Sequence, residues 1–336
     1  MKKILIASTA LISTAGFAAA EVALSGRAEM GIFQYNAAYG AAKGLANNGD
    51  PQFFTDIDVT FTMSGETDNG LTFGASVDLD EGGAISNATQ NNSDDGGATI
   101  FISGGFGTVT MGDTDGALDW ALTDAGNVGN PGSIADDETE HAGYVGAYLD
   151  GNNNGSNGDG QILRWDYTSG AFGVAVSLED DNGSNVANTG IGYAVGFKYS
   201  MNVSGTTVNF GLGHQKAADN VGVADDIKAT GVSVDATFAN GLSAGIQYAD
   251  WSSVGATGPD SNMGIGLGYT TGAISMHVNY GEVELNNGTK NDGFGIAAAY
   301  DLGGGAVVHF GYGQGETAAA PGVKQKSASL GLGLSF

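Results

Sequence analysis

Short segments of alternating apolar and polar residues follow one another from Glu21 to Phe336, and most of them end at Gly, Asn or Asp. Near the carboxyl end, Leu330, Leu332 and Leu334 alternate with Gly and Ser. A period of two is that of a β-strand, because successive side chains leave a strand on opposite faces. The pattern therefore predicts a chain built almost entirely of amphipathic strands.

The connections between these segments predict the number of strands. Seven of them are tight and rich in turn residues, at 66–70, 104–107, 169–170, 202–205, 240–241, 271–272 and 301–305. Eight are longer and polar, at 36–51, 81–97, 114–160, 181–189, 217–226, 252–260, 284–291 and 315–323. Sixteen strands with short turns at one end and long loops at the other are typical of bacterial outer-membrane barrels. We therefore expect an all-β fold, a sixteen-stranded antiparallel transmembrane β-barrel with short periplasmic turns and long external loops.

The two faces of the strands differ in chemistry. Asp56 and Asp58 alternate with Ile57 and Val59, and acidic side chains are costly against lipid, so the acidic face is predicted to line a watery lumen. Aromatic residues on the apolar face gather near both strand ends, as expected at the two membrane interfaces. Those near the short turns are Phe172, Phe238, Tyr269, Tyr300 and Phe336, and those near the long loops are Tyr193, Tyr248, Tyr280 and Tyr312.

The first twenty residues form a separate unit. Lys2 and Lys3 precede a short apolar stretch, and three alanines end at Ala20. This pattern predicts a signal peptide over 1–20 that is removed before Glu21, and hence export through the periplasm to the outer membrane. The remainder, 21–336, shows no linker and is expected to be one barrel domain.

Composition narrows the function further. The chain has no Cys, which excludes thiolate catalysis and Cys-bound metals. Its 37 acidic residues against 11 basic ones give a net charge of −26, which disfavours nucleic acid as a partner. The same excess of acids would make a lumen favour cations.

Several motifs together resemble general porins of the alphaproteobacterial type known from purple bacteria. They are 21–26, 61–65, 70–76, 101–107, 111–113, 169–172, 300–305 and the terminal Phe336. The resemblance implies a homotrimer in the lipid and lipopolysaccharide of the outer membrane, through which small hydrophilic solutes and ions diffuse passively. It also implies that Phe336 is recognised by the barrel-assembly machinery.

The longest connection, 114–160, is the predicted functional element, since loops of this length are usually functional. In porins of the resembled type it folds into the barrel and narrows the pore. The acids predicted at this constriction are Asp113, Asp115, Asp119, Asp136, Asp137, Glu138 and Glu140. The residues predicted on the pore wall are Arg27, Asp56, Asp58, Arg164 and Lys198. Because bases are few, we expect a cation preference.

The far end of this loop carries a second candidate site. Asp150, Asn152 and Asn154 have the spacing of the first ligands of an EF-hand loop, but Gln161 stands where the bidentate Glu would be. A calcium site therefore stays open beside a plain flexible loop, and no cofactor is required.

Alternatives to a general diffusion channel remain. Enzymatic activity is not expected, because the chain lacks the G-x-S-x-G arrangement that would place a nucleophile. A substrate-selective channel would differ by saturable flux. A calcium-dependent surface or adhesion barrel would instead be plugged and electrically silent.

Overall fold

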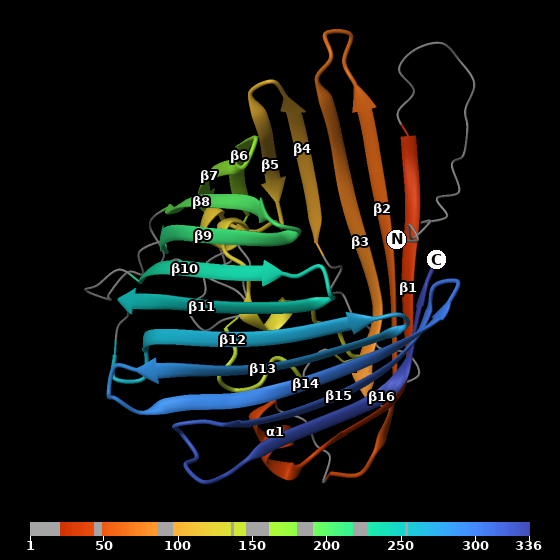
Figure 1. The fold of residues 1–336 in the computed structure, drawn as a ribbon, viewed down its shortest axis with the longest axis vertical. Helices are drawn as coiled ribbons and strands as arrows, with labels where there is room; N and C mark the ends of the chain where they lie inside the picture. Colours follow the sequence, from red (N-terminus) through yellow and green to blue (C-terminus); the bar gives the residue numbers. More distant parts are fainter. Residues whose placement is uncertain are drawn as a thin grey trace, which may run out of the picture.

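The computed structural model describes residues 21–43, 49–85, 97–135, 138–145, 161–179, 191–217, 227–252 and 255–336, with the backbone alone at 80–85. Sixteen strands in this part of the chain form one closed antiparallel barrel (Figure 1), which confirms the predicted fold. Their bounds are Glu21–Tyr35 (β1), Gln52–Glu66 (β2), Thr72–Ile85 (β3), Ala98–Gly104 (β4), Gly107–Gly112 (β5), Ile162–Ser169 (β6), Phe172–Glu179 (β7), Gly192–Val203 (β8), Thr206–Lys216 (β9), Lys228–Thr237 (β10), Leu242–Ser252 (β11), Pro259–Thr271 (β12), Ile274–Leu285 (β13), Lys290–Gly303 (β14), Ala306–Glu316 (β15) and Gln325–Ser335 (β16).

The barrel closes where its first strand meets its last. Each strand pairs with its neighbours in sequence, and β1 pairs with both β2 and β16. At the seam the Phe336 N–H donates to the Gly26 carbonyl at 2.9 Å. A closed barrel leaves no strand edge unpaired, which is required in a bilayer.

The alternation seen in the sequence separates an outer apolar face from an inner one. In β13, Met276, Val278 and Tyr280 are exposed on the outside, whereas His277 and Asn279 are 3% exposed on the inside. Phe172 and Phe336, both predicted near the short turns, are 67% exposed. The outer face is therefore a continuous apolar surface of the kind that contacts lipid.

Two of the predicted connections are shorter in the structure. The segment 284–291 was expected as a long loop, but β13 reaches Leu285 and β14 begins at Lys290. A tight turn joins them, in which the Leu285 N–H donates to Thr289 and the Gly288 N–H donates to Leu285. Likewise β3 extends to Ile85, into the loop expected at 81–97.

In the described parts of the long connections there are two short α-helices and one 3-10 helix. Helix α1, Ala37–Ala42, begins after Asn36, whose side chain accepts the Tyr39 N–H at 3.0 Å. Helix α2, Ala117–Ala121, and the 3-10 helix η1, Ala125–Asn127, belong to the connection between β5 and β6. Helix α2 contacts β7, β8 and β9, while η1 contacts β11, β12 and β13. This connection therefore follows the inner wall.

Candidate pore constriction

The connection from β5 to β6, here called the constriction loop (113–161), is anchored to the inner wall by hydrogen bonds. Its first anchors are backbone N–H groups that donate to lumenal side chains. The Ala117 N–H donates to Ser177 Oγ of β7, and the Thr123 N–H donates to Ser233 Oγ of β10, both at 2.9 Å. Since β7 and β10 are separated by β8 and β9 in the barrel wall, the loop runs around the barrel instead of leaving it.

Further hydrogen bonds anchor the loop to β13 and β15. His277 Nδ1 of β13 lies 3.0 Å from the Val128 carbonyl, and His309 Nδ1 of β15 lies 3.1 Å from the Gly132 carbonyl. The Asn279 side chain donates to the Thr139 carbonyl at 2.8 Å. These polar side chains satisfy loop carbonyls that would otherwise be buried without partners.

Glycines on the wall allow the loop to approach this closely. A Cβ at Gly266 would lie 1.7 Å from the Ala125 carbonyl oxygen, and one at Gly196 would lie 1.9 Å from the Ala117 oxygen. Other lumenal glycines would also meet loop atoms: Gly211, Gly213, Gly231, Gly245, Gly268, Gly281, Gly293, Gly295, Gly311, Gly313 and Gly315. We call this set, with Gly196 and Gly266, the glycine track. The sequence showed small lumenal positions, and the resemblance implied an infolded loop, but nothing in the sequence indicated that the loop packs on these glycines.

The predicted loop acids differ in their exposure. Asp113, Asp115 and Glu140 are exposed, and Asp119 is half-buried. Glu138 is 0% exposed, because it lies between the loop and Gly311 of β15, where it accepts a hydrogen bond from Ser133. Its carboxylate therefore does not face the open lumen, unlike the acids around it. Two further predicted acids, Asp136 and Asp137, lie outside the described residues.

Three of the five predicted wall residues, Arg27, Asp56 and Asp58, lie on β1 and β2. These two strands carry none of the loop-anchoring hydrogen bonds described above. Arg27 forms an ion pair with Glu29, a lumenal acid that is not among the residues predicted on the pore wall. Arg27 lies opposite Asp58 in the strand register, and Glu29 lies opposite Asp56. Three acids and one base thus share this part of the wall, and the local charge is negative.

The other two predicted bases, Arg164 and Lys198, lie beside α2. Arg164 Nε lies 3.2 Å from Asp166, and its Nη1 donates to the Asp115 carbonyl at 2.6 Å. The Lys198 ammonium lies 3.4 Å from the centroid of the Trp120 ring, which is a cation–π contact. Both bases are therefore engaged with acid, backbone or ring.

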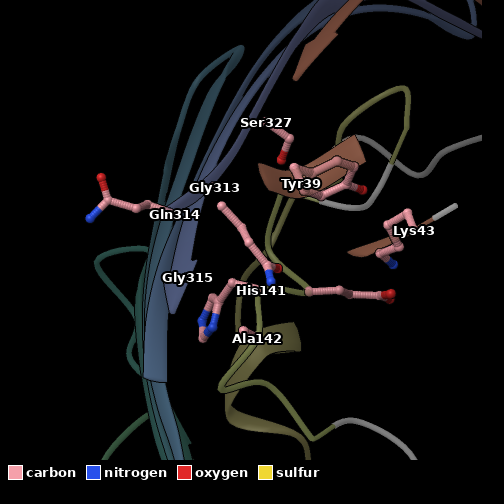
Figure 2. A pocket seen from close by; sticks show the side chains of 10 residues that line it. Tyr39, Lys43, His141, Ala142, Gly313, Gln314, Gly315 and Ser327 are labelled. Carbon is pink, nitrogen blue, oxygen red and sulfur yellow. The ribbon is translucent and has the colours of Figure 1, made fainter. Parts of the chain in front are cut away.

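A small cavity lies at the external end of the barrel, between α1, the constriction loop, β15 and β16. It has a volume of about 220 Å³, and Figure 2 shows Tyr39, Lys43, His141 and Ser327 around it, with the Gln314 side chain directed away. Burial lowers the pKa of His141 to about 4, so its imidazole is neutral at pH 7. The capping residue Asn36 before α1 was the sequence signal that could have indicated this helix.

The structure leaves the proposed calcium site open. Asp150, Asn152 and Asn154 lie outside the described residues. Within the described part of the chain, no group of three or more His, Asp or Glu side chains could hold a metal ion. None of the helices in these same residues is long and apolar enough to cross a bilayer.

Comparison with known proteins identifies the family. A family model described as Gram-negative porin matches residues 7–320. A porin of Rhodobacter capsulatus is 30% identical over 305 residues, which cover 86% of this chain and 92% of that protein. One solved porin structure has a TM-score of 0.72 at 27% identity, covering 94% of this chain and 100% of the other.

A more distant structure shares the fold alone. An anion-selective porin from Comamonas acidovorans has a TM-score of 0.58 at 14% identity, with 95% of this chain and 100% of that chain covered. Family and fold both point to a channel rather than an enzyme. The chain belongs to the Gram-negative porin family and is an outer-membrane channel protein.

Proposed function

We propose that this channel lets small hydrophilic solutes and ions diffuse passively and that it prefers cations. The observation that carries the preference is the unequal placement of charge around the constriction loop. The two bases here are Arg164, which is ion-paired with Asp166, and Lys198, which lies over the Trp120 ring; the exposed acids Asp113, Asp115 and Glu140 outnumber them. Charges at a narrow passage act at short range in a confined space, so they dominate selectivity.

The wall of β1 and β2 supports the same proposal. There Arg27 is paired with Glu29, and Asp56 and Asp58 lie on the next strand. Thr60 donates to Asp78 at 2.8 Å, which adds a further acid on β3. External acids at distances beyond about 8–10 Å are screened by salt and contribute less.

A reversal-potential measurement in a KCl gradient tests the preference. Reconstituted protein is expected to conduct potassium better than chloride. Neutralising Asp113, Asp115 and Asp119 together with Asn should lower this ratio without unfolding the barrel. Asp68 is exposed in the short turn between β2 and β3, outside the constriction loop. Asp68→Asn removes one negative charge there and should leave the ratio of potassium to chloride conduction nearly unchanged. Chloride preference in the wild type would overturn the proposal.

We also infer that the protein is exported after loss of residues 1–20, assembles as a homotrimer and sits among outer-membrane lipid and lipopolysaccharide. The 67% exposure of Phe336 at the seam supports its recognition by the barrel-assembly machinery. Gly26 and Ala28 on the outer face of β1 would let neighbouring walls approach closely.

A further inference from the structure

The external cavity has a rigid floor. Tyr39, His141 and Ser327 are 6%, 8% and 4% exposed, so their positions are fixed by packing. The Tyr39 ring lies 5.6 Å from that of Tyr35, centroid to centroid. His141 Nδ1 accepts the Gly143 N–H at 3.2 Å, which orients the imidazole. A floor held in this way is preorganised, and a ligand does not have to order it.

The rim of the cavity carries two opposite charges. Lys43 of the segment after α1 and Glu140 of the constriction loop are both exposed and both line the cavity. Gln325 and Ser327 add an amide and a hydroxyl, which can donate and accept hydrogen bonds. The imidazole of His141 is neutral at pH 7 and leaves this balance of charge unchanged.

From this arrangement we propose that the cavity is a binding subsite for small zwitterionic solutes of the α-amino-acid class. The solute carboxylate binds Lys43 and its ammonium group binds Glu140, both through charge-assisted hydrogen bonds. The subsite rests on the proposed function, because it places a hydrophilic solute inside the barrel beside the constriction loop.

The size of the cavity limits the side chain of the solute. Gly313 and Gly315 line it without side chains, and Ala142 contributes a methyl group. The volume of about 220 Å³ is below the roughly 300–1,000 Å³ typical of pockets for drug-sized ligands. Glycine, alanine and serine therefore fit the subsite better than bulky amino acids.

Other ligand classes fit less well. A sugar ring commonly stacks on an aromatic face, but the Tyr39 ring is almost fully buried against Phe33 and Tyr35. A metal ion would meet the Lys43 ammonium, and the described residues offer no three-ligand group. A simple anion or cation would meet one attractive and one repulsive charge.

Solute flux into proteoliposomes tests the subsite. Influx of L-alanine, followed by stopped-flow light scattering, should saturate with concentration, whereas influx of glycerol should rise linearly. Lys43→Gln and Glu140→Gln should each raise the half-saturating alanine concentration about tenfold, since each removes one charged partner. Lactate and ethanolamine, which carry one charge each, should not saturate in the same range.

Matched variants remove the same charges elsewhere. Lys324, in the loop before β16, forms an ion pair at 2.5 Å with Glu316 at the end of β15, and neither residue lines the cavity. Lys324→Gln and Glu316→Gln should keep the wild-type saturation. The proposal would be overturned if alanine influx in the wild type rose linearly, or if glycerol influx saturated in the same range. It would also be overturned if Lys324→Gln and Glu316→Gln raised the half-saturating alanine concentration as much as the cavity variants do. KCl conductance and reversal potential, measured on the same preparations, report separately on the proposed function.

Discussion

Single glycines on the inner wall determine how far the constriction loop extends into the lumen. Gly266→Ala would place a methyl carbon 1.7 Å from the Ala125 carbonyl oxygen, so the loop must move inward. We expect a lower single-channel conductance and a loss of about 1–3 kcal/mol in stability, the usual cost of overpacking. Conductance in planar bilayers and thermal unfolding measure the two effects.

Gly105→Ala is the matched control for this substitution. Gly105 lies in a short turn, and a Cβ built on it meets no atom within 4 Å. The single-channel conductance of Gly105→Ala should equal that of the wild type. If Gly266→Ala also kept the wild-type conductance, the loop would have to be free to slide along the wall, contrary to the close packing observed.

We expect the docking of the constriction loop on the wall to depend on pH through His141. Its pKa is about 4 when the loop is docked and returns towards 6.5 when the ring is in water, so protonation favours the undocked loop. Docking is most stable above pH 6.5 and weakens as the pH falls towards 4. At pH 5 the loss reaches about 2 kcal/mol for this one group.

Current fluctuations report on this effect. We expect the open-channel noise to increase between pH 7 and pH 5, a range in which exposed carboxylates stay mostly ionised. His141→Gln should reduce the increase. His214→Gln, on the outer face of β9 where the ring contacts Thr230 at 2.8 Å, should leave it intact. An unchanged increase in His141→Gln would assign the effect to another group.

At the scale of elements, α2 depends on the wall for its stability. It has five residues, and its N-cap, Gly116, makes no side-chain capping bond. The contact between Trp120 and Lys198 is expected to contribute about 0.5–2 kcal/mol to its docking. Trp120→Leu and Lys198→Met should therefore each increase current fluctuations.

A double-mutant cycle tests whether these two residues act together. The combination of Trp120→Leu and Lys198→Met should be no worse than either substitution alone, because one contact is lost in all three variants. Additive effects would show that the two side chains stabilise α2 separately. The barrel itself should keep its β-sheet circular dichroism in every variant.

The contrast between strands and helices shows what the sequence could predict. The strands were predictable because a period of two marks every one of them, as in β13 from Ile274 to Tyr280. Helix α2 was not, because packing against β7, β8 and β9 stabilises it and no local signal does. The burial of Glu138 and the Trp120 contact were hidden for the same reason. Each depends on where a long loop lies on a distant strand.

At the scale of the whole molecule, the outer face of β1 is predicted to contact other copies of the chain. Ala28→Trp would place a bulky ring there and should weaken the trimer. Light scattering after size-exclusion chromatography in mild detergent should give three protomers for the wild type and fewer for this variant. Ala244→Trp, on the outer face of β11, is the matched control and should remain trimeric. A folded monomer in the wild type would contradict the prediction.

The seam between β1 and β16 has a consequence for biogenesis. It joins β1, which begins at Glu21, to β16, which ends at Ser335, so the barrel cannot close until these two distant segments meet. Such a contact has the greatest sequence separation in the molecule, and contacts of this kind form slowly. Until then the strands at both ends expose unpaired backbone, which invites association with other chains. We therefore expect this protein to be most prone to aggregate in the period before β1 pairs with β16.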